Sequence, residues 1–222
     1  FVRRVFMTGG EPTIIQRNLD YIDKIVESGH SGNVELIFTT NATNINQKFI
    51  DISKKFKSVS FNVSIDAVNG LAKYIRYPSD WDTIKKNLQN IYNNGVGVSF
   101  NTTIQWLNMT RLSEIFDYIE HCDINFGGIW FQLVTDPHYL DPIHAPVFMK
   151  EKCINDIESF LHRPFLNDPK YNNILFGELK QSLIQTKNFL QKNLDNVQHT
   201  NEFLKRMEIL DRLRNQNLFS VL

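Results

Sequence analysis

Short apolar runs alternate with helical stripes over the first two-thirds of the chain. Runs of four to eight residues that are rich in β-branched and aromatic side chains predict buried strands. The runs end about 30 residues apart, which is the length of one βα unit. The predicted strands are Val2–Met7, Val34–Thr40, Val59–Ile65, Val96–Ile104 and Gly128–Val134.

Apolar residues at three- and four-residue spacing predict amphipathic helices between these strands. Asn44 or Asn46 could cap the second helix, Asp80 caps the third, and Gly95 closes the third in a left-handed conformation. Pro12 suits the first turn of a helix. The helices expected from the pattern are Ile14–Val26, a segment around Phe49–Phe56, Trp81–Asn94 and Leu112–Cys122.

Strands that alternate with helices at this step imply an α/β fold with a parallel sheet. Five strands are too few for a closed eight-stranded barrel, so a partial barrel and an open doubly wound sheet remain. After residue 137 we expect a loop at 138–146, an irregular stretch at 165–173, and helices only. We therefore predict domains at 1–137 and 138–222. The later helices are Phe148–Leu161, Phe176–Leu194 and Thr200–Leu213.

Composition narrows the function classes. Among 222 residues, 24 basic side chains balance 24 acidic ones, which argues against a dedicated nucleic-acid binder. No apolar run approaches the length of a membrane span. Only two cysteines occur, Cys122 and Cys153, which argues against a disulfide framework or a Cys-rich zinc module. We expect a cytoplasmic protein without nucleic-acid or membrane partners, in which both cysteines are buried or half-buried thiols.

The carboxyl ends of parallel strands form the functional edge of such a sheet. Here that edge is polar and glycine-rich, which suits a ligand with hydroxyl, amino and carboxylate groups. The residues expected there are Thr8, Gly9, Gly10, Glu11, Pro12, Thr40, Asn41, Ser64, Asp66, Asn101, Thr102, Thr103 and Gln132.

Each of these residues also has a plainer interpretation. Gly9-Gly10 lets the backbone approach a ligand closely, but it also suits a tight turn. Asp66, which shares a strand face with Ser64, could receive ribose hydroxyls or cap a turn. Arg76, expected in a loop with Tyr74, Tyr77 and Pro78, could clamp a carboxylate or form a surface ion pair.

Metal binding is not predicted from the sequence. The six histidines form no His-x-x-x-His or His-Glu-x-x-His pattern. His138 and His144 share the loop after the fifth strand, but their spacing fits no established motif. Phosphate-loop, nucleophile-elbow and dinucleotide fingerprints are also absent from the sequence.

Taken in order, the strand-end residues resemble the core of the radical S-adenosylmethionine (SAM) superfamily. The resemblance covers about residues 2–150 and rests on several motifs. These are Gly9-Gly10-Glu11-Pro12, Thr40-Asn41, Ser64-Ile65-Asp66-Ala67, Arg76 with Pro78-Ser79-Asp80-Trp81-Asp82, and Asn101-Thr102-Thr103. The segment Pro137–Pro146 and Lys150 resemble the twitch/SPASM-like branch, which has a C-terminal extension.

This resemblance implies a partial (β/α)6 TIM-like barrel, with strands two to six present and a helical C-terminal extension. It implies SAM and a [4Fe–4S] cluster as cofactors, and a reductant such as flavodoxin or ferredoxin. The implied reaction cleaves SAM reductively to a 5′-deoxyadenosyl radical, which abstracts hydrogen from a peptide or small-molecule substrate. The protein positions the groups, while the cofactors carry the difficult chemistry.

The resemblance also assigns roles to residues, although it identifies no catalytic side chain. The resemblance places Glu11, Pro12 and Asn41 in the cofactor site, together with the residues named in the next two sentences. The backbone from Gly9 to Glu11 would hold the methionyl amino group. Ser64, Asp66 and Asn101 would contact ribose or carboxylate, Arg76 would hold the carboxylate, and Gln132 would lie near adenine or substrate.

One departure from the family pattern matters. In this family, the three cysteines of a Cys-x-x-x-Cys-x-x-Cys motif after the first strand ligate the cluster. Cys122 and Cys153 cannot replace this motif. We expect the cluster ligands upstream of residue 1, and we expect the 222 residues alone to be inactive. Two alternatives stay open: a cluster-less radical-SAM-like binding or scaffold module, and a phosphate- or sugar-binding α/β enzyme with Gly9-Gly10 as its anion site.

Overall fold

A computed structural model describes residues 2–167 and 174–221, with the side chains of 174–177 left aside. Five strands lie in one sheet in the order β1-β2-β3-β4-β5, and the first four pair in parallel. All five predicted strands are confirmed, with ends shifted by one or two residues. They are β1 (Arg4–Met7), β2 (Glu35–Thr40), β3 (Ser58–Ser64), β4 (Gly97–Ile104) and β5 (Gly128–Leu133).

The chain forms two compact units, each built from several segments. The first unit runs to Ile65 and adds Ser79–Asn101 and Asp123–Gly128. The second unit contains Asp66–Pro78, Thr102–Cys122 and the chain from Ile129 onward. The domain boundary at residues 137 and 138 stays a prediction. Among the described residues, no helix combines the length and apolar character needed to cross a membrane.

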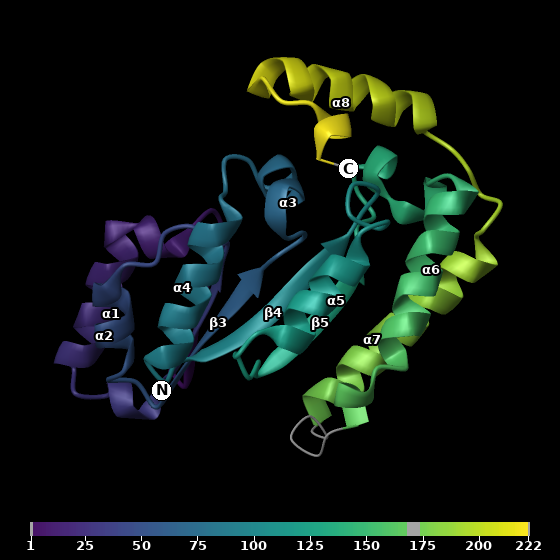
Figure 1. Cartoon of the computed structure of the whole chain (residues 1–222). Coiled ribbons are helices and arrows are strands. Elements are labelled where there is room, and N and C mark those ends of the chain that lie inside the picture. Colours follow the sequence, from purple (N-terminus) through teal and green to yellow (C-terminus); the bar gives the residue numbers. More distant parts are fainter. Residues whose placement is uncertain (1, 168–173, 222) are drawn as a thin grey trace. The chain divides into compact units, whose positions relative to one another are not determined.

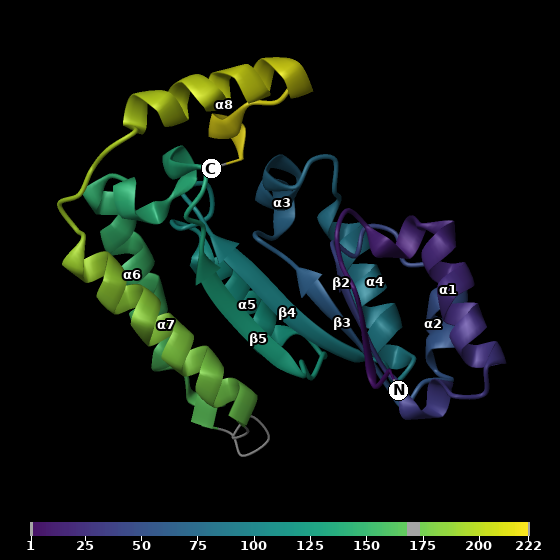
Figure 2. The ribbon, with the colours of Figure 1, turned by 180° about the vertical axis from the view of Figure 1, so that it is seen from behind.

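In the first unit, the helices cover one face of the sheet (Figures 1 and 2). These helices are α1 (Gln16–Glu27), α2 (Gln47–Ser53) and α4 (Trp81–Asn93). Alternate strand residues are buried, and the rings of Phe38 and Phe61 stack at 4.7 Å between centroids. Helices on one face, with strands in chain order, belong to a barrel wall. A doubly wound sheet has helices on both faces and a reversal of strand order.

The predicted helix ends in this unit are confirmed in atomic detail. Asn46, not Asn44, caps α2, because its Oδ1 accepts the Lys48 N–H at 2.9 Å. Asp80 caps α4 by accepting the Thr83 N–H at 2.9 Å. Gly95 follows α4 with φ +73°, a left-handed conformation that glycine adopts without a steric penalty.

The second unit is mostly helical, as expected beyond the fifth strand. Pro164–Asn167 forms a 3₁₀ turn inside the stretch predicted to be irregular, and the rest of that stretch, 168–173, lies outside the described residues. The helices of the second unit are α3 (Asn69–Ile75), α5 (Leu112–His121), α6 (Val147–Leu161), α7 (Ile174–Lys192) and α8 (Thr200–Arg214). The unit also contains the 3₁₀ turns η3 (His138–Leu140) and η4 (Pro142–His144).

Helix α3 corrects the sequence prediction of a loop around Tyr74. Leu71, Ala72 and Tyr74 are buried on this seven-residue helix, and Arg76 is its C-cap. Two turns of helix are too short to produce a clear apolar period, so tertiary burial decides the conformation here.

The side chain of Lys150 is hydrogen-bonded to the segment that connects α7 and α8. Its side chain on α6 is fully buried, and Nζ donates hydrogen bonds to the carbonyl oxygens of Asn193 (2.7 Å), Leu194 (3.0 Å) and Asn196 (2.8 Å). These carbonyls follow the end of α7, where helix carbonyls lack partners within the helix. Burial lowers the pKa of Lys150, and the nearby Asp195 carboxylate opposes that shift.

We expect Lys150→Met to lower the free energy of unfolding by about 2–4 kcal/mol, because three carbonyls lose a charged donor at once. Urea unfolding monitored by circular dichroism would measure the change. Lys85→Met, which breaks an ion pair with Asp82 that is exposed on both sides, should cost less than about 1 kcal/mol. Equal effects of the two substitutions would contradict the role assigned to Lys150.

Candidate functional site

The Gly9-Gly10 turn is separated from the end of β1 by Thr8 alone and is open to solvent. Gly9 has φ +86° and Gly10 has φ +56°, both in the left-handed region that favours glycine. A Cβ atom at either position would have no protein atom within 4 Å. The backbone is therefore available to a ligand at the carboxyl end of β1, and a side chain there would project into the space above it.

Glu11 ties this turn to the end of β2. Its Oε1 accepts hydrogen bonds from the hydroxyls of Thr13 and Thr40, each at 2.6 Å, and its Oε2 accepts the Asn41 N–H at 2.8 Å. Pro12 is buried and opens a 3₁₀ turn, η1 (Pro12–Ile14), instead of the long helix. The carboxylate of Glu11 is thus engaged within the protein and fixes the shape of the loop.

Asn41 also shapes the end of β2. Its Oδ1 accepts hydrogen bonds from the N–H of Thr43 at 2.9 Å and from its hydroxyl at 2.6 Å. This is an Asx turn, which reverses the chain after the strand. The side chains of Glu11 and Asn41 therefore accept hydrogen bonds from loop N–H groups and hold the backbone near the glycine turn.

Toward the carboxyl ends of β2, β3 and β4, the sheet face opposite the helices carries polar side chains. Ser64 of β3 and Asn101 of β4 are register partners, so their side chains lie on the same face as neighbours. One row further into the sheet, Thr39, Asn62 and Ser99 are register partners on three strands. Sequence reasoning missed this row, although the alternation in Val59–Ile65 already placed Asn62 on the face opposite the buried residues.

Asp66 and Arg76 meet in the second unit. Asp66 is 5% exposed, and its Oδ2 accepts hydrogen bonds from Arg76 Nε at 2.8 Å and Nη2 at 2.7 Å. Its Oδ1 accepts the Thr103 N–H at 2.8 Å. Burial raises the pKa of the Asp66 carboxyl, while the Arg76 charge and the Thr103 N–H act to lower it. The pair joins the end of α3 to the end of β4.

Asn108 completes this second group and was not singled out as a site residue. It is 1% exposed, and its Nδ2 donates to the backbone oxygens of Asp66 (2.7 Å) and Thr103 (2.8 Å). Gln132 is exposed on β5, and its Nε2 lies 3.4 Å from the Thr103 hydroxyl, a long hydrogen bond. Only its burial distinguishes Asn108 from the many other asparagines, so no sequence pattern would have found it.

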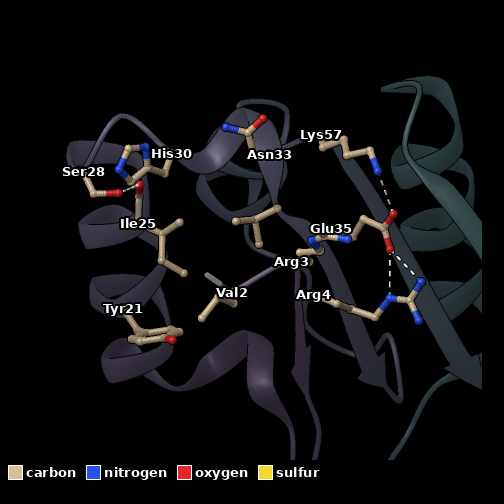
Figure 3. A pocket seen from close by; sticks show the side chains of 11 residues that line it. Val2, Arg3, Arg4, Tyr21, Ile25, Ser28, His30, Asn33, Glu35 and Lys57 are labelled. Atoms are coloured by element: carbon tan, nitrogen blue, oxygen red, sulfur yellow. Dashed lines mark hydrogen bonds and ion pairs between the residues drawn. The ribbon is translucent and has the colours of Figure 1, made fainter.

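A hollow of about 1130 Å³ in the first unit lies elsewhere (Figure 3). It is lined by the start of β1 and β2 and the end of α1, including Arg3, Tyr21 and Ile25. On its wall, Glu35 pairs with Arg4 at 2.7 Å and with Lys57 at 3.0 Å. Ligands of parallel sheets bind at the carboxyl ends of strands, so this hollow is not the candidate site.

Comparison with known families identifies the chain. Residues 1–119 match the model of the radical SAM superfamily. That stretch is more than half of the 222 residues, so the chain belongs to the radical SAM superfamily. No curated protein matches the chain in sequence.

Solved structures support the same fold. The chain is similar to native anSMEcpe with bound AdoMet and the Cp18Cys peptide, with a TM-score of 0.55, 16% identity, and coverage of 74% of this chain and 48% of that one. Native anSMEcpe with bound AdoMet gives a TM-score of 0.56 at the same identity and coverage of this chain. The chain thus spans about half the length of the protein it matches, and the expected partial barrel is confirmed.

We expect Arg76→Met to lower the free energy of unfolding by about 2–3 kcal/mol at pH 7, because it leaves the buried Asp66 carboxylate without its counter-charge. The pKa of Asp66 then rises further above its value in the unfolded chain. Such a carboxyl stabilises the fold most at low pH, and the contribution is lost as pH rises through the folded pKa. The deficit should therefore grow between pH 4 and pH 7 in denaturant titrations.

Two variants test this assignment. Asp66→Asn combined with Arg76→Met should show a smaller, pH-independent deficit. Arg212→Met, which breaks an exposed pair with Glu208, should cost less than about 1 kcal/mol. A deficit for Arg76→Met that does not change with pH would refute the pairing as the cause.

Proposed function

We propose that this chain forms the SAM-binding wall of a radical SAM enzyme that abstracts hydrogen from a peptide or small-molecule substrate. The observation that carries the proposal is the Gly9-Gly10-Glu11-Pro12 turn. It leaves two glycines open at the end of β1, while Glu11 holds the turn against the end of β2.

The donors and acceptors at this edge suit SAM. The exposed backbone at Gly9 and Gly10 offers carbonyl oxygens to an ammonium group without steric hindrance from a side chain. Ser64 and Asn101 offer a hydroxyl and an amide to ribose or carboxylate oxygens. When SAM is bound beside a reduced iron–sulfur cluster, it supplies a carbon radical for hydrogen abstraction.

We propose supporting roles for the other candidate residues. Asn41 shapes the loop through its turn, and Pro12 starts the 3₁₀ turn behind it. Asp66 and Arg76 are paired with each other, so we propose that they set the ends of α3 and β4 and act on the ligand through that backbone. We propose that the row of Thr39, Asn62 and Ser99 faces the substrate, and that Gln132 lies near adenine or substrate.

A phosphate site at Gly9-Gly10 is less favourable. The turn leads into three residues of 3₁₀ helix, and the Glu11 carboxylate already takes the Thr13 N–H at 3.3 Å. A phosphate would lie next to this negative charge, and the Thr13 N–H would not be available to bind it. The Glu11 carboxylate and the short 3₁₀ turn favour a ligand with a cationic end, such as the ammonium and sulfonium groups of SAM.

We propose that cysteines outside these 222 residues hold the cluster. Cys153 is fully buried on α6, and burial raises the pKa of its thiol. Since the thiolate is the form that ligates iron, a buried neutral thiol is a poor ligand. Cys122 is half-buried and follows α5. A reductant such as flavodoxin or ferredoxin, the twitch/SPASM-like branch and a cytoplasmic location stay predictions.

We expect the 222-residue chain alone to release no 5′-deoxyadenosine from SAM under anaerobic, reducing conditions, even after incubation with iron and sulfide. Its two cysteines supply fewer than the three ligands that a [4Fe–4S] cluster of this family uses. Liquid chromatography with mass detection would measure the product. Turnover by the chain alone would overturn the assignment of the cluster ligands.

In the complete gene product, reconstituted with iron and sulfide, we expect Gly10→Ala to reduce 5′-deoxyadenosine formation at limiting SAM by about tenfold or more. One crowding methyl group costs about 1–3 kcal/mol. Gly29→Ala is the matched control, because Gly29 also has a left-handed φ of +75° and open space around its Cβ.

Both substitutions should lower stability by about 1–2 kcal/mol through backbone strain. Only Gly10→Ala should weaken SAM binding in calorimetry. If the two variants lose activity equally, the loss comes from strain and the glycine turn does not hold SAM. If the complete protein binds no SAM and releases no 5′-deoxyadenosine, the proposed function is wrong.

A further inference from the structure

Three histidines and one aspartate gather in the second unit, whereas the glycine turn belongs to the first. His138, Asp141 and His144 lie on η3, η4 and the residue between them, and their nearest ligand atoms are all within 4.8 Å of one another. His199, which precedes α8, adds a third imidazole. Its ring centre is 4.9 Å from that of His144 and 6.0 Å from that of His138.

The spacing of the three rings fits a shared metal ion. Zn²⁺–nitrogen bonds are about 2.0–2.1 Å long, so two imidazoles on one tetrahedral ion have ring centres about 5 Å apart. The His138 ring lies 6.2 Å from that of His144 and 6.0 Å from that of His199, so its side chain must shift by about 1 Å toward both. The two 3₁₀ turns carry the His138 and His144 rings on exposed or half-buried side chains that can make this movement.

An unpaired nitrogen provides an independent observation. Nδ1 of His144 is buried and has no hydrogen-bond partner among the described residues. A buried polar atom without a partner costs about 1–3 kcal/mol. Coordination of a metal ion would remove that cost, because it gives the nitrogen lone pair a partner without any rearrangement of the backbone.

The loop is held rigidly by groups that do not belong to the cluster. The Asp141 backbone oxygen accepts a hydrogen bond from Nε1 of the buried Trp106 at 2.7 Å. The Gln198 N–H donates to the His144 backbone oxygen at 3.1 Å, and this bond brings His199 beside the loop. Asp141 is 9% exposed, and its Oδ1 accepts the Ile143 N–H at 3.0 Å, so its orientation is fixed.

We propose that His138, Asp141 and His144 bind a divalent transition-metal ion of the zinc class, with His199 as the fourth ligand. Imidazole nitrogens with a single carboxylate favour zinc-class ions over Mg²⁺ and Ca²⁺, which prefer oxygen ligands. The ion would fasten the start of α8 to the loop after β5. This site shares no residue with the proposed SAM site and does not depend on it.

Calorimetry with ZnCl₂ on the tag-free, chelator-treated 222-residue chain tests the proposal. We expect saturable binding of one ion per chain and a Tm that rises with free Zn²⁺. Substitution by Co²⁺ should give the visible absorption of a tetrahedral site.

Variants distinguish the site from non-specific binding. His138→Ala, at an exposed position where folding is not at risk, and His144→Ala should each weaken Zn²⁺ binding more than about tenfold. His199→Ala should weaken it as well and remove the tetrahedral Co²⁺ spectrum. The matched controls are His121→Ala and His162→Ala, whose Nδ1 atoms lie 2.8 Å and 2.7 Å from carbonyl oxygens of their own helices.

Cys122→Ser should also leave Zn²⁺ binding unchanged, because the thiol is not among the ligands. Absence of saturable Zn²⁺ binding in the unmodified chain would overturn the proposal. So would equal binding by His138→Ala and the unmodified chain. Failure of the SAM experiments would leave this result unaffected, since neither SAM nor an iron–sulfur cluster is present in the calorimetry with ZnCl₂.

Discussion

Parallel pairing is the constraint on which the first unit depends. Because β1 to β4 all run in one direction, every connecting helix must return the chain to the same starting edge. The consequence is that loops far apart in sequence leave the sheet together at its other edge. Gly9-Gly10, Thr40-Asn41 and the Ser64–Asn101 pair are neighbours for this reason alone. The helices on one face then leave the opposite face free to carry polar side chains.

The polar residues at this edge differ in what they contact. Glu11 and Asn41 direct their oxygens to hydroxyls and N–H groups of their own loops, and Asp66 is fully occupied by Arg76 and Thr103. These side chains direct their hydrogen-bonding capacity to the protein. What they leave exposed is glycine backbone. In this motif, the side chains are hydrogen-bonded within the protein and hold the loop, while the glycine backbone stays exposed. The motif therefore needs both the glycines and the carboxylate.

Much of the fold could be predicted because the signals are local. The strands and the caps at Asn46 and Asp80 each depend on a few adjacent residues. Helix α3 could not be predicted, because only burial of Leu71 and Tyr74 in the folded unit favours it. The His138–His144–His199 cluster was missed for a related reason. More than fifty residues separate His199 from the loop, and a hydrogen bond from Gln198 to that loop brings them together. The Asp66–Arg76 pair was likewise visible only as two separate candidates.

Lys150 has a consequence for experiments on the helical region. An amine without solvent access cannot react with acylating reagents, whereas its helix neighbour Lys152 can. Modification of Lys150 therefore requires α6 to separate from the carbonyls that follow α7. Chemical footprinting at this one side chain would report the opening of the α6–α7 pair directly. The same burial would keep the residue from enzymatic acetylation for as long as that pair stays closed.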